Sequence, residues 1–270
     1  MDAITDLVRR LVDTYIIPNA SILKTTWYSL AISAFLILST GRIHASYGRH
    51  HVSSSFIPNV NGKLGWMIME LCSPTSAFLF YSTYKAAGGP LLSQGHVLLA
   101  LWLGHYLNRA VISVLLSPEM KNSRVDIVLM SGFFNVVNAG WIGADFGLLN
   151  ASEFILTPRT ILGLILFVTG ITVNISSDYH LQQLRREKAK KGDYVLPGWG
   201  LFKYILSPNY AGETVEWIGF ALIMGRESAW SFVLWTVCNL WPRAAANYNW
   251  YKGKFGDKVG TRKSIIPGVY

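Results

Sequence analysis

The sequence is poor in charge. Asp, Glu, Lys and Arg make up 14% of its 270 residues, against about 25% in a typical soluble domain. Hydrophobic residues make up 51% of the chain, and the mean hydropathy is +0.31. This composition argues against an ordinary soluble domain and predicts a membrane protein built as one compact bundle.

Cysteine is also scarce, and the common site motifs are missing. Cys72 and Cys238 lie in apolar segments without C-x-x-C spacing, which argues against a disulfide framework or a zinc site. The histidines form no metal-spaced set, although His44, His50 and His51 cluster in one segment, so no metal is expected. The chain has no P-loop, no H-E-x-x-H, and no G-x-G-x-x-G following a strand, so the corresponding soluble nucleotide-binding and metalloprotease classes are not expected.

Long apolar runs are what the chain has instead. A helix needs about 20 residues to cross a bilayer. The runs that approach this length are 25–41, 65–84, 95–117, 124–143, 155–177, 209–225 and 228–246. The fourth run contains Ser131, Gly132 and Asn135, and the sixth is short, so six spans is the alternative. The predicted fold is all-α, a polytopic bundle of seven transmembrane helices.

The first 20 residues have a different pattern. Apolar side chains between Ile4 and Ile16 recur at helical spacing, with charged residues on the other faces. This pattern predicts an amphipathic helix at the membrane interface that ends near Pro18. Residues 1–20 are therefore assigned to this helix and residues 21–270 to a single transmembrane domain.

The basic residues are distributed unevenly between the predicted loops. With seven spans, segments 42–63, 118–125, 180–207 and 243–270 share one side of the membrane and hold 17 Lys and Arg residues, against 6 on the other side. The positive-inside rule places that side, with the C-terminus, in the cytosol. Because this bias explains the net charge of +9, and no nucleic-acid-reading module is found, nucleic acid is not an expected partner.

Two carboxylates enter the sixth run, Glu213 and Glu216. A charge deep in a bilayer costs about 3 kcal/mol, so each needs a partner or a function. Ser207 and Pro208 are typical N-cap and N1 residues and predict the helix start. Asn209 and Glu213 then share one face near a helix N-terminus, which can hold a phosphate or a carboxamide.

Other polar residues follow helical spacing too. Asn174, Asp178 and Arg185 form one stripe and Arg243, Asn247 and Tyr251 another, while Glu70 and the pair Tyr106 and Arg109 lie inside the second and third runs. Without a basic neighbour Glu70 would stay protonated as a donor; its alternative role is a structural hydrogen bond. The stripes predict a site for a large polar ligand with an apolar partner beneath it. The basic stretch 185–198 is either a solvated or headgroup-contacting surface or, in part, a phosphate site.

These residues carry a resemblance to the steroid 5α-reductase family of membrane reductases. The matching segments are Asn174-Ile-Ser-Ser-Asp178-Tyr, Leu181-Gln-Gln-Leu-Arg185, Tyr194 with Pro197, Gly200-Leu-Phe and Ser207-Pro-Asn-Tyr-Ala-Gly-Glu-Thr-Val-Glu-Trp217. The likeness extends more weakly to Glu70, to His105-Tyr106 with Arg109, and to Ala45-Ser46-Tyr47-Gly48. The Asn-x-x-x-Glu-x-x-Glu-Trp pattern is typical of the broad superfamily, and Glu70 with His105-Tyr106 is typical of the steroid branch.

The resemblance implies a seven-helix bundle in which NADPH enters from the cytosol and a 3-oxo-Δ4 steroid lies deeper. It implies that Glu70 and Tyr106 bind and polarise the substrate carbonyl, with Trp66 nearby. The cofactor would be held mainly by residues 174–270. The implied cofactor-binding residues are Tyr47, Arg109, Asn174, Asp178, Arg185, Tyr194, Asn209, Glu213, Arg243, Asn247 and Tyr251. One departure is Asn247, where the family has a histidine; another is that only Lys121 and Arg124 follow the third run.

The expected activity is NADPH-dependent reduction of the Δ4 bond, with Tyr106 hydrogen-bonded to a protonated Glu70. The alternatives are reduction of an enoyl thioester, a polyprenol or a sterol ring, a membrane isoprenylcysteine-type methyltransferase, and a non-enzymatic transporter or scaffold. The expected partners are a steroid or other lipid substrate and membrane lipids, with the protein monomeric. The expected location is a bacterial inner membrane or the endoplasmic reticulum.

Overall fold

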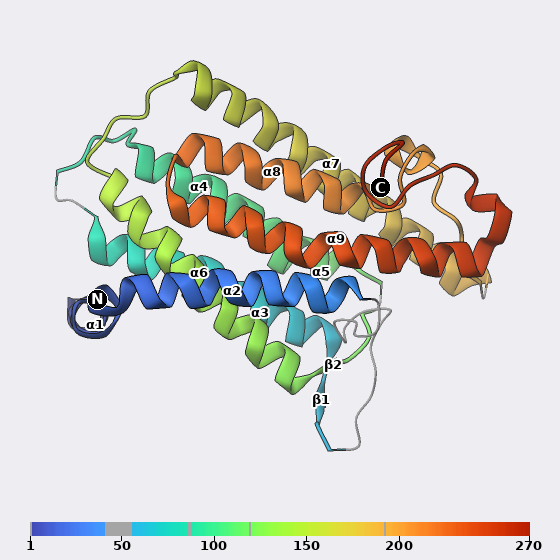
Figure 1. Ribbon diagram of the computed structural model, residues 1–270, viewed down its shortest axis with the longest axis horizontal. Coiled ribbons are helices and arrows are strands. Elements are labelled where there is room, and N and C mark those ends of the chain that lie inside the picture. The colour runs from blue at the N-terminus through green and yellow to red at the C-terminus, as the bar shows by residue number, and fades with distance from the viewer. Residues whose placement is uncertain (1, 41–55, 86–87, 119, 192) are drawn as a thin grey trace.

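A computed structural model describes residues 2–40, 56–85, 88–118, 120–191 and 193–270. Tyr47 and the cluster of His44, His50 and His51 lie outside these residues. Long helices dominate the described chain, and several of them run roughly along its long axis while others cross it obliquely (Figure 1). The prediction of a mostly helical protein is confirmed.

The first helices cover the predicted interfacial segment and the first four runs. They are α1 Asp2–Leu11, α2 Ala20–Ser39, α3 Gly62–Tyr84, α4 Gln94–Tyr106, α5 Ser113–Leu116 and α6 Val125–Leu149. A π-helical segment, Leu107–Ile112, joins α4 to α5. Between α1 and α2 the chain stays helical, through a π turn at Val12–Ile16 and a 3-10 turn at Ile17–Asn19 that contains Pro18.

The remaining helices are α7 Pro158–Lys191, α8 Pro208–Met224 and α9 Glu227–Phe255. Short 3-10 helices precede α8 at Gly200–Lys203 and follow α9 at Gly256–Val259. Two two-residue strands, β1 Asn59–Val60 and β2 Ser123–Arg124, pair antiparallel. α8 starts at Pro208 as predicted, but the Ser207 side chain makes no cap bond to the helix.

Four stretches of the described chain are long and apolar enough to cross a membrane: Ala3–Ser39, Gln94–Leu116, Val125–Leu149 and Pro158–Lys188. Their exposed side chains include Met130 and Phe133 on α6 and Ile165 on α7. Such apolar surface is suited to lipid. The protein is therefore a multi-pass membrane protein, while the count of seven spans and the interfacial role of α1 stay predictions.

Pairings between loops show which segments share an end of the bundle. The β1–β2 pair joins the first two basic segments, and Arg186 Nη2 donates to the carbonyl of Leu116 at 2.6 Å. A parallel bridge joins Ile205 to Lys263. The described parts of the four basic segments thus lie together, as the span order predicts. At the other end, Ser93 is bridged to Glu153, and Lys24 pairs with Glu227.

The weak fourth run is an unbroken helix. Asn135, which argued against a span, is buried, and its Nδ2 donates to the carbonyl of Met69 on α3 at 2.6 Å. The polar group is satisfied by the neighbouring helix, so it does not interrupt α6.

Small residues bring α7 and α8 close together. A Cβ on Gly170 would collide with the backbone of Glu216, and one on Gly212 with the backbone of Asn174. Glycine at these positions lets the two helix backbones approach. This contact places the polar stripe of α7 directly against the carboxylates of α8.

Candidate functional site

Arg109 lies at the centre of a cluster of three carboxylates. Its Nε is 3.6 Å from Glu70 Oε1 on α3, and its Nη1 is 3.8 Å from Asp178 Oδ2 on α7 and 4.0 Å from Glu213 Oε2 on α8. These ion-pair separations exceed the usual hydrogen-bond length of about 3 Å. The guanidinium therefore balances all three charges rather than being clamped to one.

The backbone around Arg109 is unusual for an apolar helix. It sits in the π-helical segment Leu107–Ile112, a geometry that is rare and frequently marks functional sites. Trp66 braces the arginine: its Nε1 donates to the Arg109 carbonyl at 3.3 Å, and the Arg109 Cζ lies 4.8 Å from the Trp66 ring centroid. The hydrogen bond holds the backbone at Arg109, and the cation–π contact holds its guanidinium.

The protonated state of Glu70 was predicted for a Glu70 without a basic neighbour. Arg109, carried by the π segment, is such a neighbour, so that condition is not met and the protonation of Glu70 stays a prediction. No hydrogen bond joins Glu70 to Tyr106 among the described side chains. Tyr106 is buried on α4 and packs against Trp102 and His105 at ring distances of 5.2 and 5.0 Å.

The predicted stripes of α7 and α8 meet in one hydrogen-bond network. Asn174 Nδ2 donates to the Asn209 carbonyl at 3.0 Å and lies 3.4 Å from Glu213 Oε2. Asn209 Nδ2 donates to Asp178 Oδ1 at 2.9 Å. Asn209 therefore links the carboxylates around Arg109 to the start of α8, where its own side chain faces a cavity.

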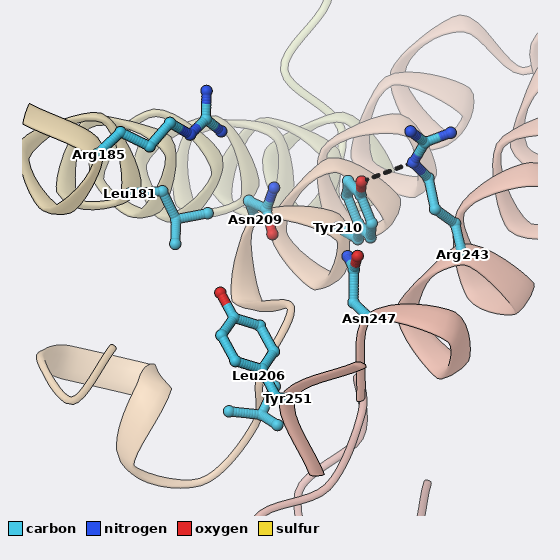
Figure 2. Close-up of a pocket in the computed structure, with 8 residues that line it drawn as sticks. All are labelled: Leu181, Arg185, Leu206, Asn209, Tyr210, Arg243, Asn247 and Tyr251. Carbon is cyan, nitrogen blue, oxygen red and sulfur yellow. Dashed lines mark hydrogen bonds between the residues drawn. The ribbon is translucent and has the colours of Figure 1, made fainter. Parts of the chain in front are cut away.

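That cavity has a volume of about 120 Å³. It is lined by Leu181, Arg185, Leu206, Asn209, Tyr210, Arg243, Asn247 and Tyr251 (Figure 2). Five of these residues were selected from the sequence as cofactor contacts: Arg185, Asn209, Arg243, Asn247 and Tyr251. The structure thus brings the i, i+4 stripe of α9 to the N-terminus of α8.

Tyr210 is a cavity residue that the sequence reading missed. Its hydroxyl accepts a hydrogen bond from Arg243 Nε at 3.0 Å, drawn as the dashed line in Figure 2. The candidate residues of α8 were chosen from the helix face that Asn209 and Glu213 share. Tyr210 lies on another face and points toward α9, so it was not among them. The sequence did offer one indication of its role, because Tyr210 follows Asn209 within the segment Ser207–Trp217 that carries the family resemblance.

Tyr194 does not line the cavity but lies beside the end of α9. Its ring packs edge-on to Trp250 at 4.9 Å, and Lys188 Nζ lies 3.7 Å from its centroid. The neighbouring Asp193 pairs with Lys254 at 2.9 Å, and this hydrogen bond lowers the pKa of the exposed Asp193 carboxyl. These contacts hold the segment that follows α7 next to the cavity-lining part of α9.

Glu216 is fully buried and hydrogen-bonded to His105 on α4, with 2.7 Å between Oε1 and Nδ1. His105 is thus the partner that a carboxylate buried in the bundle needs. The His105 ring also packs on Trp217 at 4.5 Å. The pair ties α4, which carries Tyr106, to α8, which carries Glu213.

The C-terminal segment packs against residues that line the cavity or flank it. Leu206 N donates to the Lys263 carbonyl at 2.9 Å, and Ser207 N donates to the Ser264 carbonyl at 3.0 Å. The fully buried Val259 packs with the cavity residues Leu206 and Tyr251 in one hydrophobic cluster. The chain after α9 therefore holds in place the residues just before α8, without lining the cavity itself.

Together these features define a class: a multi-pass membrane protein whose bundle holds a half-buried arginine–carboxylate cluster beside a cationic, amide-rich cavity. The family model of 3-oxo-5-alpha-steroid 4-dehydrogenases matches residues 121–270. This match covers more than half of the chain and includes the cavity residues. The chain belongs to this family, the steroid 5-alpha-reductases, and is accordingly an oxidoreductase acting on CH–CH bonds.

Individual relatives agree over most of their length. The chain is 34% identical over 250 residues to 3-oxo-5-alpha-steroid 4-dehydrogenase 2 of Rattus norvegicus, covering 90% of this chain and 94% of the relative. It is 33% identical over 239 residues to steroid 5-alpha-reductase DET2 of Arabidopsis thaliana, covering 84% and 88%. It is 31% identical over 247 residues to 3-oxo-5-alpha-steroid 4-dehydrogenase 1 of Homo sapiens, covering 89% and 92%. The predicted family is confirmed.

Proposed function

We propose that the protein uses NADPH to reduce the Δ4 double bond of 3-oxo-Δ4 steroids, giving 5α-reduced products. The main support is the convergence of the expected cofactor residues. Five of them line one cavity, and Asn174, Asp178 and Glu213 are linked to it through Asn209. The named activity of the relatives supports a steroid enone as substrate.

The donor chemistry of the cavity fits a dinucleotide phosphate. Arg185 and Arg243 supply guanidinium groups, which bind phosphate through paired N–H donors. The cavity also lies at the N-terminus of α8, where the positive end of the helix dipole favours an anion. Asn209 and Asn247 add carboxamides that bind hydroxyl or amide groups. We assign the cavity to the phosphate end of NADPH and the Arg109 cluster to its nicotinamide side.

The chain's part in the reaction is electrostatic. When bound, NADPH supplies the hydride. Reduction of the enone places negative charge on the ketone oxygen, and the Tyr106 hydroxyl donates a hydrogen bond to that oxygen. With substrate bound, a protonated Glu70 on α3 hydrogen-bonds to the Tyr106 hydroxyl and supports it as the donor. The buried aromatic side chains around Trp102 exclude water, which strengthens these interactions. The α-carbon takes its proton from solvent or a nearby hydroxyl.

The test is an assay of purified protein with NADPH and testosterone or progesterone, followed by mass spectrometry. The expected product carries two additional hydrogens and a 5α configuration. Turnover of only an enoyl thioester, a polyprenol or a sterol-ring substrate would overturn the steroid assignment. Copurified S-adenosylmethionine, with no NADPH binding, would overturn the reductase assignment as a whole.

Tyr210 provides a test of the cofactor cavity. Replacing it with phenylalanine removes the acceptor that holds Arg243. A hydrogen bond to a charged group is worth about 1.5–3 kcal/mol, so we expect KM for NADPH to rise by about tenfold or more while kcat changes little. Steady-state kinetics measure this split. The control is Tyr15→Phe, an exposed tyrosine remote from the cavity; an equal rise in both variants would contradict the role.

We also propose that the C-terminus and the cavity face the cytosol, because the segments richest in Lys and Arg share that end. The membrane is a bacterial inner membrane or the endoplasmic reticulum. A reporter fused after Tyr270 tests the orientation, and a signal from the non-cytosolic side would contradict it.

A further inference from the structure

The segment between α7 and α8 exposes large aromatic and apolar side chains. Trp199 is 57% exposed, Leu201 41% and Tyr204 60%, whereas Phe202 between them is fully buried. These residues flank or form the 3-10 helix Gly200–Lys203. Phe202 fixes the segment to the bundle, and its outer face presents two aromatic rings and an aliphatic chain that the described protein does not cover.

The depth of this segment follows from its contacts with α7. The ring of His180 packs against Trp199 at 5.8 Å and against Phe202 at 5.5 Å. At 1.5 Å per residue, His180 lies roughly 33 Å along α7 from Pro158, close to the ~30 Å thickness of a bilayer core. Tyr179, beside His180, is also exposed. The exposed rings therefore lie where α7 leaves the hydrocarbon.

The charges at this level suit lipid headgroups. Lys203 is exposed within the segment, and Arg262, which donates to the Pro197 carbonyl at 3.2 Å, and Lys263 lie on the C-terminal chain that packs against it. Below it, α7 exposes Ile165 and Val168, so the apolar surface continues toward the bilayer centre. Tryptophan and tyrosine beside lysine, above an apolar face, is the arrangement favoured at a membrane–water interface.

We propose that Trp199, Leu201, Lys203 and Tyr204 form an interfacial anchor that binds the phospholipid headgroup region of the leaflet next to the cofactor cavity. Along the chain, the same segment continues into Leu206 and Ser207, which are hydrogen-bonded to the C-terminal chain. The anchor thus fixes the wall of the cavity and the start of α8 relative to the membrane. It rests on the protein being membrane-spanning and not on the steroid reaction.

The test uses full-length protein in phosphatidylcholine–phosphatidylglycerol nanodiscs, and its readout is fluorescence rather than activity. The Trp199 signal is the difference between wild type and Trp199→Phe. We expect lipids brominated near the headgroup to remove most of this signal. Lipids brominated near the chain ends, and aqueous iodide, should remove much less. Trp102→Phe, which removes a fully buried indole, is the control; its difference signal should respond to none of the three quenchers.

Other outcomes overturn the anchor. Stronger quenching by iodide than by shallow bromines places Trp199 in water, and stronger quenching by deep bromines places it in the hydrocarbon. A signal that no quencher reaches places it inside the protein. Failure of the steroid assay leaves this measurement unaffected, so the two proposals fail separately.

Discussion

Replacing Arg109 with glutamine is expected to abolish NADPH-dependent reduction and to destabilise the protein by about 3–5 kcal/mol. The variant leaves Glu70, Asp178 and Glu213 close together without their shared cation. Carboxylates with low exposure repel one another strongly when no counter-charge is present. Lysine is not expected to restore function, because a point charge cannot reach three carboxylates from one position as a planar guanidinium does.

Thermal unfolding in detergent and turnover in nanodiscs measure the two effects. Adding Asp178→Asn to Arg109→Gln removes one of the stranded charges, so it should recover part of the lost stability without restoring activity. The matched control is Lys24→Gln, which breaks an exposed ion pair with Glu227 and should cost no more than about 1 kcal/mol. Equal losses in Arg109→Gln and Lys24→Gln would refute the central role of Arg109.

The helices were predictable because bilayer thickness sets the length of apolar runs. Each predicted run has a helix at its position, and the Ser207-Pro208 start of α8 was predicted to the residue. Helix ends were less predictable where polar residues continue a helix beyond the apolar stretch, as in α7, which runs to Lys191. The π segment around Arg109 could not be predicted, because no composition rule distinguishes it from an α-helix.

The candidate site was predictable to the extent that its residues repeat along one helix. Arg243, Asn247 and Tyr251 recur every four residues, so their shared face follows from helix geometry. The contacts of Glu70 with Arg109 and of His105 with Glu216 join different helices. Only the packing of α3, α4 and α8 creates them, and one sequence contains no periodic signal for it. Tyr210 was missed for the same reason, since its partner Arg243 is on α9.

The second large effect is expected from Tyr106→Phe, which should lower kcat by about 10²–10³ with little change in stability or in KM for NADPH. The variant keeps the ring packed against Trp102 and His105 and removes only the hydroxyl. If that hydroxyl stabilises the charge on the ketone oxygen, its loss has the cost typical of one oxyanion donor. Glu70→Ala should also lower kcat, since it removes the carboxyl group that supports the Tyr106 donor.

Tyr81→Phe is the matched control because it removes another buried hydroxyl, one that donates to Asn150 Oδ1 at 3.0 Å on the far side of the bundle. It should lower stability by about 1 kcal/mol and leave kcat unchanged. The two variants should thus have opposite effects. Tyr106→Phe should lower kcat without lowering stability, and Tyr81→Phe should lower stability without changing kcat. Near-normal turnover by Tyr106→Phe would show that the ketone oxygen takes its hydrogen bond from another donor.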